Sequence, residues 1–373
     1  MIPYIRGRVA AQAHVGIPEG TYEEEYAREG FFGRYAHLYR THPPVCWDAI
    51  EGDLRQRAYD GSRYFTDAPA DYRRHVLLEN ADVEIATASV GAPMGYYFRN
   101  ADGDELYFVH SGTGKLETDF GPLNYEPGDY LVVPRGTTHR WVPSTPTALL
   151  ETLAFSEFRF PDKGMLGQHA LFDPAMIRVP EPSAITDPKA PRELRIRRSG
   201  STTKVTYPFC PIDVVGWKGT LTVWQLNVRD IRPVLSDTYH LPPSAHTTFV
   251  ANGFVVCTFL PRPLENGDPK AVKVPFYHSN IDYDEVLFYH DGDFFSRTGI
   301  HPGMLTFHPQ GIHHGPQPGA VSRTSGVTRT NEVAVMIDTR RPLNPTPSAT
   351  KVESTEYWRS WTPAQTSTSG EKS

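Results

Sequence analysis

Residues 277–292 read YHSNIDYDEVLFYHDG, and residues 303–314 read GMLTFHPQGIHH. The same residue types occur earlier in the chain at the same spacings, in YFRNADGDELYFVHSG at 97–112 and GDYLVVPRGTTH at 128–139. The seven matched pairs are Asn100 and Asn280, Glu105 and Glu285, Gly112 and Gly292, Gly128 and Gly303, Pro134 and Pro309, Gly136 and Gly311, and His139 and His314. This agreement in order and spacing indicates an internal duplication.

The repeated residues have a physical explanation. A Glu in a run such as DEVLFYHDG points to one face of a strand, and the Gly that follows closes a hairpin turn. The Pro-x-Gly turn then returns the chain, so that the next His faces the same interior. Each copy is therefore expected to direct a Glu and a His into the mouth of one small β-barrel.

Length and composition extend this interpretation to the whole chain. A chain of 373 residues favours two domains. With 30 Gly, 34 Pro and 12% aromatic residues, short segments such as DYLVVPRG and LTVWQLNV predict an all-β fold. We predict an irregular N-terminal arm and a first barrel over residues 1–160, a linker and a second barrel over 161–345, and a tail over 346–373. One short helix is expected around TYEEEYAREGFF, and WRSW is expected to anchor the tail.

Charge and cysteine content exclude several classes of protein. The net charge is −6, which argues against a partner bound through phosphate neutralisation, and so against nucleic acid. No stretch predicts a membrane span or a signal peptide. The three cysteines have no paired spacing, so neither a disulfide scaffold nor a cysteine zinc site is indicated, and a reducing cytoplasm is expected. A small-molecule partner is the default expectation.

The two stretches of each copy resemble the motif pair of the cupins, HxHxxxxE followed by GxxxxxPxGxxH. The chain looks like a bicupin, with two double-stranded β-helix (jelly-roll) barrels. In the second copy His278 takes the place of the first His, Asn280 replaces the second, and Glu285 and His314 complete a set of two His and one carboxylate. In the first copy Phe98 stands where His278 does, so we expect that barrel to be structural and metal-free.

This ligand set suits non-haem Fe(II), because three positions on one face of the metal stay open. A zinc hydrolase remains possible with the same ligands, as do manganese and nickel. Two other classes of bicupin are alternatives to a dioxygenase: sugar-phosphate isomerases, and proteins that have lost their metal ligands. The first is disfavoured by the lack of an evident Lys/Arg phosphate grip, and the second by the complete triad.

A closer resemblance is to homogentisate 1,2-dioxygenases, and especially to a shorter bacterial branch. The stretches that carry it are DVVGWKG, TYHLPPS, FYHSN with the following Glu, and HHGPQPG, supported by PYIRG, THPP and EVAVMIDTRRPL. The resemblance implies ring cleavage of homogentisate to maleylacetoacetate in aromatic amino-acid catabolism, with dioxygen and a small aromatic dihydroxy compound as substrates. It also implies a homo-oligomer.

The site residues implied by this resemblance are specific. His278, Glu285 and His314 would be the Fe(II) ligands, and His240 would be the catalytic acid/base. His308 and Asn280 would lie around the ligands. His313 is not expected to be a ligand, because successive strand residues point to opposite faces. His290 and His301 are expected at the surface without partners.

Three positions depart from the family pattern. Glu285 follows His278 by seven residues instead of six, and we keep it because Glu105 marks the same place in the first copy. Phe294 stands where other members carry a Tyr, which removes a hydroxyl that could contact substrate. Lys218 replaces the His of a GWHG segment. The substrate is therefore left open among homogentisate, gentisate and other hydroquinones.

Overall fold

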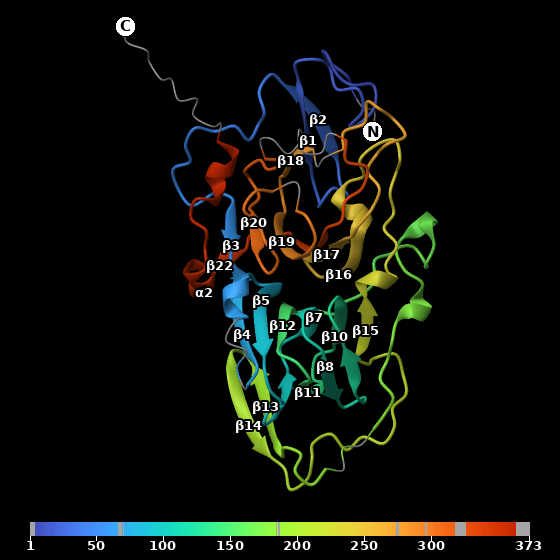
Figure 1. Ribbon diagram of the computed structural model, residues 1–373, viewed down its shortest axis with the longest axis vertical. Helices are drawn as coiled ribbons and strands as arrows, with labels where there is room; N and C mark the ends of the chain where they lie inside the picture. The colour runs from blue at the N-terminus through green and yellow to red at the C-terminus, as the bar shows by residue number, and fades with distance from the viewer. Residues whose placement is uncertain are drawn as a thin grey trace.

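The computed structural model describes residues 4–65, 69, 71–183, 185, 187–273, 276–294, 297–317 and 326–362. The described chain is almost entirely β-structure, arranged as two barrels along the long axis of the molecule (Figure 1). Its helical segments are one short α-helix and six single turns of 3₁₀-helix: α2 (Pro347–Lys351), Gly61–Tyr64, Gly164–Leu166, Pro174–Met176, Val228–Asp230, Pro243–His246 and Tyr357–Trp361. None of the helices in these ranges is long and apolar enough to cross a membrane.

The first barrel consists of two sheets. The larger sheet has the order β15 (Trp224–Asn227), β10 (Asp129–Val133), β7 (Asp104–Ser111), β12 (Thr147–Ala154), β5 (Val83–Val90), β4 (Arg73–Glu79) and β22 (Asn344–Pro345). The smaller sheet has the order β14 (Ser201–Thr206), β13 (Glu193–Arg198), β6 (Tyr97–Asn100), β11 (Thr138–Pro143), β8 (Gly114–Thr118) and β9 (Leu123–Tyr125).

The second barrel also consists of two sheets. One has the order β16 (Thr247–Ala251), β17 (Phe254–Phe259), β21 (Val333–Thr339), β19 (Asp284–Asp291), β20 (Leu305–His308) and β3 (Arg57–Tyr59). The other has the order β18 (Tyr277–Asn280), β1 (Tyr22–Ala27) and β2 (Tyr35–Arg40), with β1 parallel to β18. The predicted all-β bicupin fold is confirmed.

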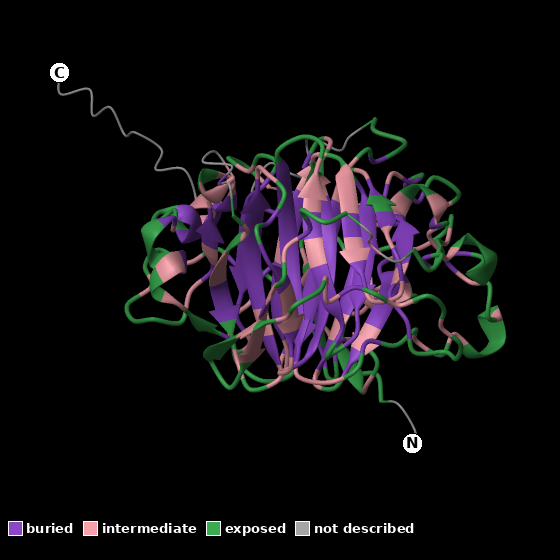
Figure 2. Ribbon diagram, turned by 90° about the horizontal axis from the view of Figure 1, so that it is seen from below, coloured by how far each residue is buried: buried purple, intermediate pink, exposed green. Residues whose placement is uncertain are grey.

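The two barrels pack against each other through a shared apolar core. This core joins Phe108 and Tyr130 of the first barrel to Val286, Phe288 and Ile337 of the second. Alternate residues of β7 and β12 face this core, while the residues between them face the interior of the first barrel. Both faces of β12 and of most of β7 are therefore buried. Figure 2 shows largely buried strands through the middle of the molecule.

The backbone supports the internal duplication. The three repeated glycines adopt left-handed conformations with nearly equal φ angles in the two copies: +89° and +95° at Gly112 and Gly292, +86° and +87° at Gly128 and Gly303, and +84° and +89° at Gly136 and Gly311. Only glycine adopts this region without strain, which explains why the same residue type returns at these turns. In addition, Phe98 pairs with His139 just as His278 pairs with His314.

Strand pairing crosses the domain boundaries that the sequence suggests. Strands β1, β2 and β3 lie within residues 1–160, yet they pair in the sheets of the second barrel. Conversely, β13, β14 and β15 lie within residues 161–345 and pair in the first barrel. The predicted domain boundaries after residues 160 and 345 therefore remain a prediction. The strand pairing shows that each barrel contains strands from both halves of the chain.

Two local predictions are wrong. The segment TYEEEYAREGFF contains strand β1 and no helix, because pairing with β18 on one edge and β2 on the other outweighs the helix preference of its Glu residues. His290 also has a partner, since its Nδ1 lies 3.0 Å from Nδ1 of His110 at the junction of the barrels. His301 is exposed, as expected, but its Nε2 lies 3.7 Å from Oδ1 of Asp60.

Candidate metal centre

Three predicted ligands meet inside the second barrel. His278 lies on β18, Glu285 on β19, and His314 in the turn after β20. The backbones of His278 and His314 exchange two hydrogen bonds, of 2.9 and 3.1 Å, which hold the two imidazoles side by side. The Nε2 atoms of His278 and His314 lie 3.8 and 3.4 Å from Oε2 of Glu285. All three side chains are buried, and their donor atoms lie within 4.8 Å of one another.

The Nε2 atoms of both histidines make no hydrogen bond among the described residues and are free to bind a cation. Nδ1 of His278 donates to the carbonyl of Phe276 at 2.8 Å, so its Nε2 carries the lone pair. That Nε2 and both ring nitrogens of His314 are buried without a hydrogen-bond partner among the described residues. Buried polar atoms are rarely left unpaired in folded proteins, so the two Nε2 atoms, which face Oε2 of Glu285, fit metal ligands.

The charge state of the group also fits a metal site. Burial alone would raise the pKa of Glu285, but neighbouring His314 and contacts from His278 and His308 hold that pKa well below its usual range. Burial, and then the nearby His278, lower the pKa of His314 to about 3. At neutral pH the group therefore presents a carboxylate and a neutral imidazole, the forms that bind metals.

His308 lies directly beside the carboxylate. Its Nδ1 donates to Oε1 of Glu285 at 2.7 Å, and its Nε2 lies 3.3 Å from the hydroxyl of Tyr357. Burial lowers the pKa of His308, so the ring is neutral and its Nε2 accepts from the tyrosine. Tyr357 was not predicted as part of this site. The expected anchoring of WRSW is seen in Trp361, which donates to the carbonyl of Gly315, next to His314.

Asn280 and Phe294 have different surroundings. Asn280 is buried two residues after His278 on β18, on the same face of the strand, and its Oδ1 has no partner among the described residues. Phe294 packs edge-on against Tyr289 within an apolar cluster that also contains Tyr357 and Trp361. Phe294 thus belongs to the same apolar cluster as Tyr357, whose hydroxyl contacts His308.

His240 is outside the group of three. Its Nδ1 lies 2.9 Å from Oε1 of Glu265, and its ring packs edge-on against Phe276 at 6.0 Å. Phe276 in turn packs edge-on against His278 at 5.5 Å, so it stands between the two histidines. His313 points away from the ligands to Glu24, 2.8 Å distant. Lys218 is exposed, next to a Trp217 ring that packs on Phe120 of the first barrel.

The first barrel has a contrasting interior. Phe98 packs edge-on against His139, and Glu105 accepts a hydrogen bond from Asn100 at 2.9 Å. Burial, and then nearby Glu151, raise the pKa of Glu105 to about 8, while burial lowers the pKa of His139 to about 4. The remaining interior residues are mostly apolar: Val109, Leu116, Leu131, Val133, Trp141 and Leu149.

Sequence reasoning missed several polar residues of the second barrel. Asp338 lies opposite Glu285 on β21, buried beside it, and burial raises its pKa well above the usual range. Glu25 of β1 lies opposite His278 of β18, and it contacts His14 and His37. The alternation of Glu23 and Glu25 along one strand face was the available signal, and the helix prediction concealed it.

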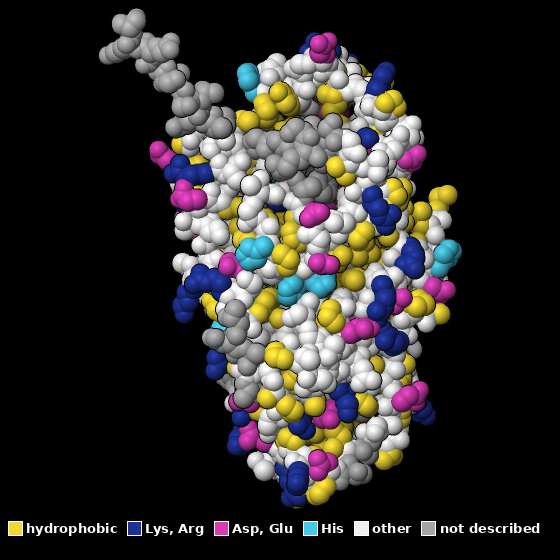
Figure 3. Space-filling view, in the orientation of Figure 1, with side chains coloured by type: hydrophobic (Ala, Val, Ile, Leu, Met, Phe, Trp, Pro, Cys, Tyr) yellow, Lys and Arg dark blue, Asp and Glu magenta, His cyan; other side chains and the backbone are white. Residues whose placement is uncertain are grey.

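The three cysteines are free thiols. Acidic and basic side chains are interspersed on the face seen in Figure 3, and histidines gather across its middle, at the level where the barrels meet.

The chain is similar to several known proteins. Residues 77–228 match the family model described as "Homogentisate 1,2-dioxygenase N-terminal". A Saccharolobus solfataricus protein named "putative dioxygenase" is 33% identical over 91% of this chain and 92% of its own length. The homogentisate 1,2-dioxygenase of Bradyrhizobium diazoefficiens is 29% identical over 68% of this chain, and the match spans 59% of that protein. Among solved structures, a cupin 2 conserved barrel domain protein from Leptotrichia buccalis aligns over its whole length with 79% of this chain, at 10% sequence identity and a TM-score of 0.37. Together with the duplicated barrels and their motifs, the family match and the sequence relatives show that the chain belongs to the homogentisate 1,2-dioxygenase family.

Proposed function

We propose that the protein is an Fe(II)-dependent dioxygenase that cleaves the ring of homogentisate, giving maleylacetoacetate, or of a closely related hydroquinone such as gentisate. The observation that carries this proposal is the convergence of two imidazole Nε2 atoms on one carboxylate oxygen in a buried barrel interior. Family membership supports the class of reaction. Homogentisate as the substrate is supported by the names of relatives that are longer than the matched region.

His278, Glu285 and His314 would hold the metal. When bound, Fe(II) would activate dioxygen and carry the electrons exchanged with the aromatic ring. The unpartnered nitrogens of the two histidines and the ionised carboxylate match the donor types that this metal takes.

Other residues of the chain orient this group. Tyr357 and His308 form a relay of hydrogen bonds that ends on Oε1 of Glu285 and leaves Oε2 facing the histidines. Such outer contacts fix the orientation of a ligand and commonly change metal affinity roughly 10–100-fold when removed.

We assign the proton-accepting role to His240. Oε1 of Glu265 lies 2.9 Å from its Nδ1, and a proton on that nitrogen would leave Nε2 free to accept one. The same contact and the ring's burial orient the imidazole, as a general base requires. A His240→Asn variant is expected to bind metal normally and to lose roughly 100-fold or more of kcat.

The test measures oxygen uptake after anaerobic loading with Fe(II), using homogentisate, gentisate and hydroquinone in parallel. We expect uptake with one of these compounds, together with the absorbance of a ring-opened product. His314→Ala is expected to abolish it, and the matched control His301→Ala, at an exposed position, is expected to retain full activity. Absence of uptake with all three compounds, or full activity in His314→Ala, would overturn the proposal.

A further inference from the structure

A second group of histidines and carboxylates lies in the N-terminal arm. His14, Glu23 and His37 each offer a donor atom within 4.8 Å of the other two, and Glu25 lies among them. His14, Glu23 and Glu25 are buried, and His37 is partly buried. We call these four residues the arm cluster.

The arm cluster repeats the arrangement of the first centre. Nε2 of His14 and Nε2 of His37 lie 3.0 and 3.3 Å from one carboxylate oxygen, Oε2 of Glu25. In the first centre two Nε2 atoms likewise converge on Oε2 of Glu285. Metal–ligand bonds of about 2 Å place neighbouring ligand atoms roughly 3 Å apart, so the separations in the arm cluster suit donors around one ion.

A hydrogen-bonded carboxylate and a ring stack hold His14 of the arm cluster in place. Nδ1 of His14 lies 2.6 Å from Oε1 of Glu23, and the other oxygen of Glu23 accepts from the hydroxyl of Tyr39 at 2.7 Å. A ligating histidine usually donates its second nitrogen to a carboxylate in this way. His14 also stacks on Phe276 with ring centroids 4.0 Å apart, which holds the imidazole plane in position.

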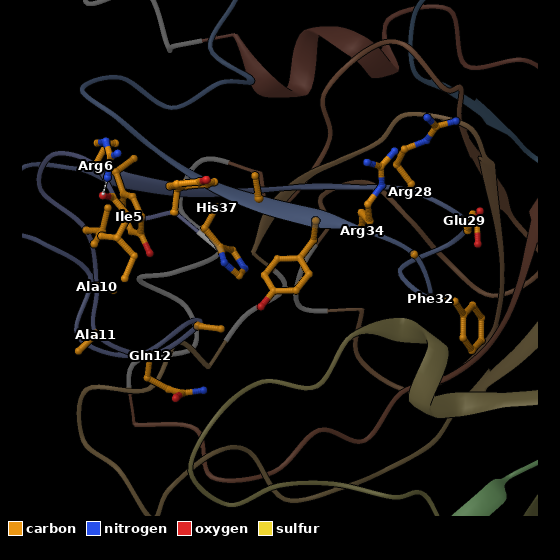
Figure 4. A pocket seen from close by; sticks show the side chains of 17 residues that line it. Ile5, Arg6, Ala10, Ala11, Gln12, Arg28, Glu29, Phe32, Arg34 and His37 are labelled. Carbon is orange, nitrogen blue, oxygen red and sulfur yellow. Dashed lines mark hydrogen bonds between the residues drawn. The ribbon is translucent and has the colours of Figure 1, made fainter. Parts of the chain in front are cut away.

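An access route reaches the cluster from solvent. His37 and Tyr39 line a cavity of about 1060 Å³ between strand β2 and the N-terminal segment. Figure 4 shows the His37 ring directed into the middle of this cavity, with Arg28 and Arg34 toward one end and Ile5 and Arg6 toward the other. A hydrated cation can therefore approach His37 without crossing the barrel wall.

We propose that the arm cluster is a second divalent-metal site, with His14, His37 and Glu25 as ligands and Glu23 holding His14. The ion ties three separate pieces of chain together: the turn at His14, strand β1 and strand β2. Glu25 lies opposite His278 on the neighbouring parallel strand, so the site braces the wall of the barrel that carries the first centre. It is a structural site and does not depend on the proposed reaction.

A network of ion pairs without metal would use the same side chains. The two arrangements differ in charge: the carboxylates of Glu23 and Glu25 are neutralised either by one divalent cation or by protons on the imidazoles. Metal stoichiometry separates the two, because only the metal site retains an ion after the excess is removed.

The experiment uses the full chain, stripped with a chelator, loaded with Co²⁺ and separated from excess metal by gel filtration. Bound cobalt is measured by atomic emission and by visible absorption. The wild type is expected to retain two Co²⁺ per chain. His314→Ala, with an intact arm, is expected to retain one, Glu25→Gln and His37→Asn are expected to retain one each, and Glu25→Gln with His314→Ala is expected to retain none.

The control is His42→Asn, at an exposed position in the same arm, which should retain two Co²⁺. The inference is overturned when Glu25→Gln and His37→Asn retain as many ions as the wild type, or when His314→Ala retains none. Failure of the first centre has a different signature, since His314→Ala would then leave the wild-type count unchanged while the arm variants still lower it.

Discussion

At the scale of single residues, the orientation of Glu285 depends on two side chains that are distant in sequence. His308 comes from the strand that pairs with β19, and Tyr357 comes from the C-terminal segment. One carboxylate oxygen is held by this relay, so the other is presented to His278 and His314. The relay therefore positions a ligand without itself contacting the metal.

Removing the relay should weaken metal binding in steps. We expect His308→Gln to lower Fe(II) affinity roughly 10–100-fold and Tyr357→Phe to lower it less, roughly up to tenfold, because phenylalanine keeps the packing and removes only the hydroxyl. Affinity is measured by competition with a chromophoric chelator. Tyr26→Phe, at an exposed position of β1, is the matched control and should leave affinity unchanged. Wild-type affinity in both relay variants would contradict this role.

At the scale of elements, the turns of the two copies share both sequence and backbone conformation. Gly292 ends β19 with φ of +95°, and a Cβ added there would come within 2.2 Å of the carbonyl oxygen of Asn331. Gly136 has a similar φ of +84°, yet nothing lies within 4 Å of its Cβ position. A comparison of substitutions at these two positions therefore distinguishes the cost of backbone strain from the cost of a steric clash.

Alanine substitutions at these glycines should therefore differ. Gly136→Ala is expected to cost about 1 kcal/mol of unfolding free energy, because only the left-handed backbone is strained. Gly292→Ala should cost clearly more, about 3 kcal/mol or above, because the backbone of the neighbouring turn must also shift. Urea denaturation of both variants measures the difference. Equal losses would show that the close contact at Gly292 relaxes freely.

Strand β1 shows how pairing decides a local structure. Its Glu-rich sequence favours a helix on propensity alone, but two neighbouring strands satisfy its backbone groups on both edges. As a strand, it places Glu23 and Glu25 on one face, toward His14. The arm cluster exists only because this segment is extended.

At the scale of the whole molecule, the barrels meet at a pair of equivalent residues. His110 and His290 each lie five residues after the repeated Glu, and their Nδ1 atoms are 3.0 Å apart. Burial, and then the proximity of His290, lower the pKa of His110 to about 4, and burial lowers the pKa of His290. The pair is therefore neutral when the barrels are packed.

This pair should make stability sensitive to acid. The pKa of His110 is lower in the folded chain than the usual 6.5. Its contribution to the free energy of unfolding is therefore complete above pH 6.5 and is lost as the pH falls toward 4. In this pH window we expect the free energy of unfolding of the wild type to fall by up to about 1.4 kcal/mol more per pH unit than that of His110→Asn. Urea denaturation from pH 7 to 4 measures the slopes, with exposed His301→Asn as the control. Parallel slopes in wild type and His110→Asn would exclude the pair as the cause.

The duplication, the all-β class and the family can be read from the sequence alone, because turn glycines, strand alternation and motif spacing are local patterns. It also brought forward His278, Glu285 and His314, whose order follows from those patterns and whose convergence the structure shows; their role as Fe(II) ligands remains a prediction. Three features became visible only in the folded chain: the N-terminal arm completes the second barrel, Tyr357 reaches His308, and His110 meets His290. These contacts join residues far apart in the chain, and they depend on how two barrels and a long arm pack, which leaves no periodic signal in the sequence.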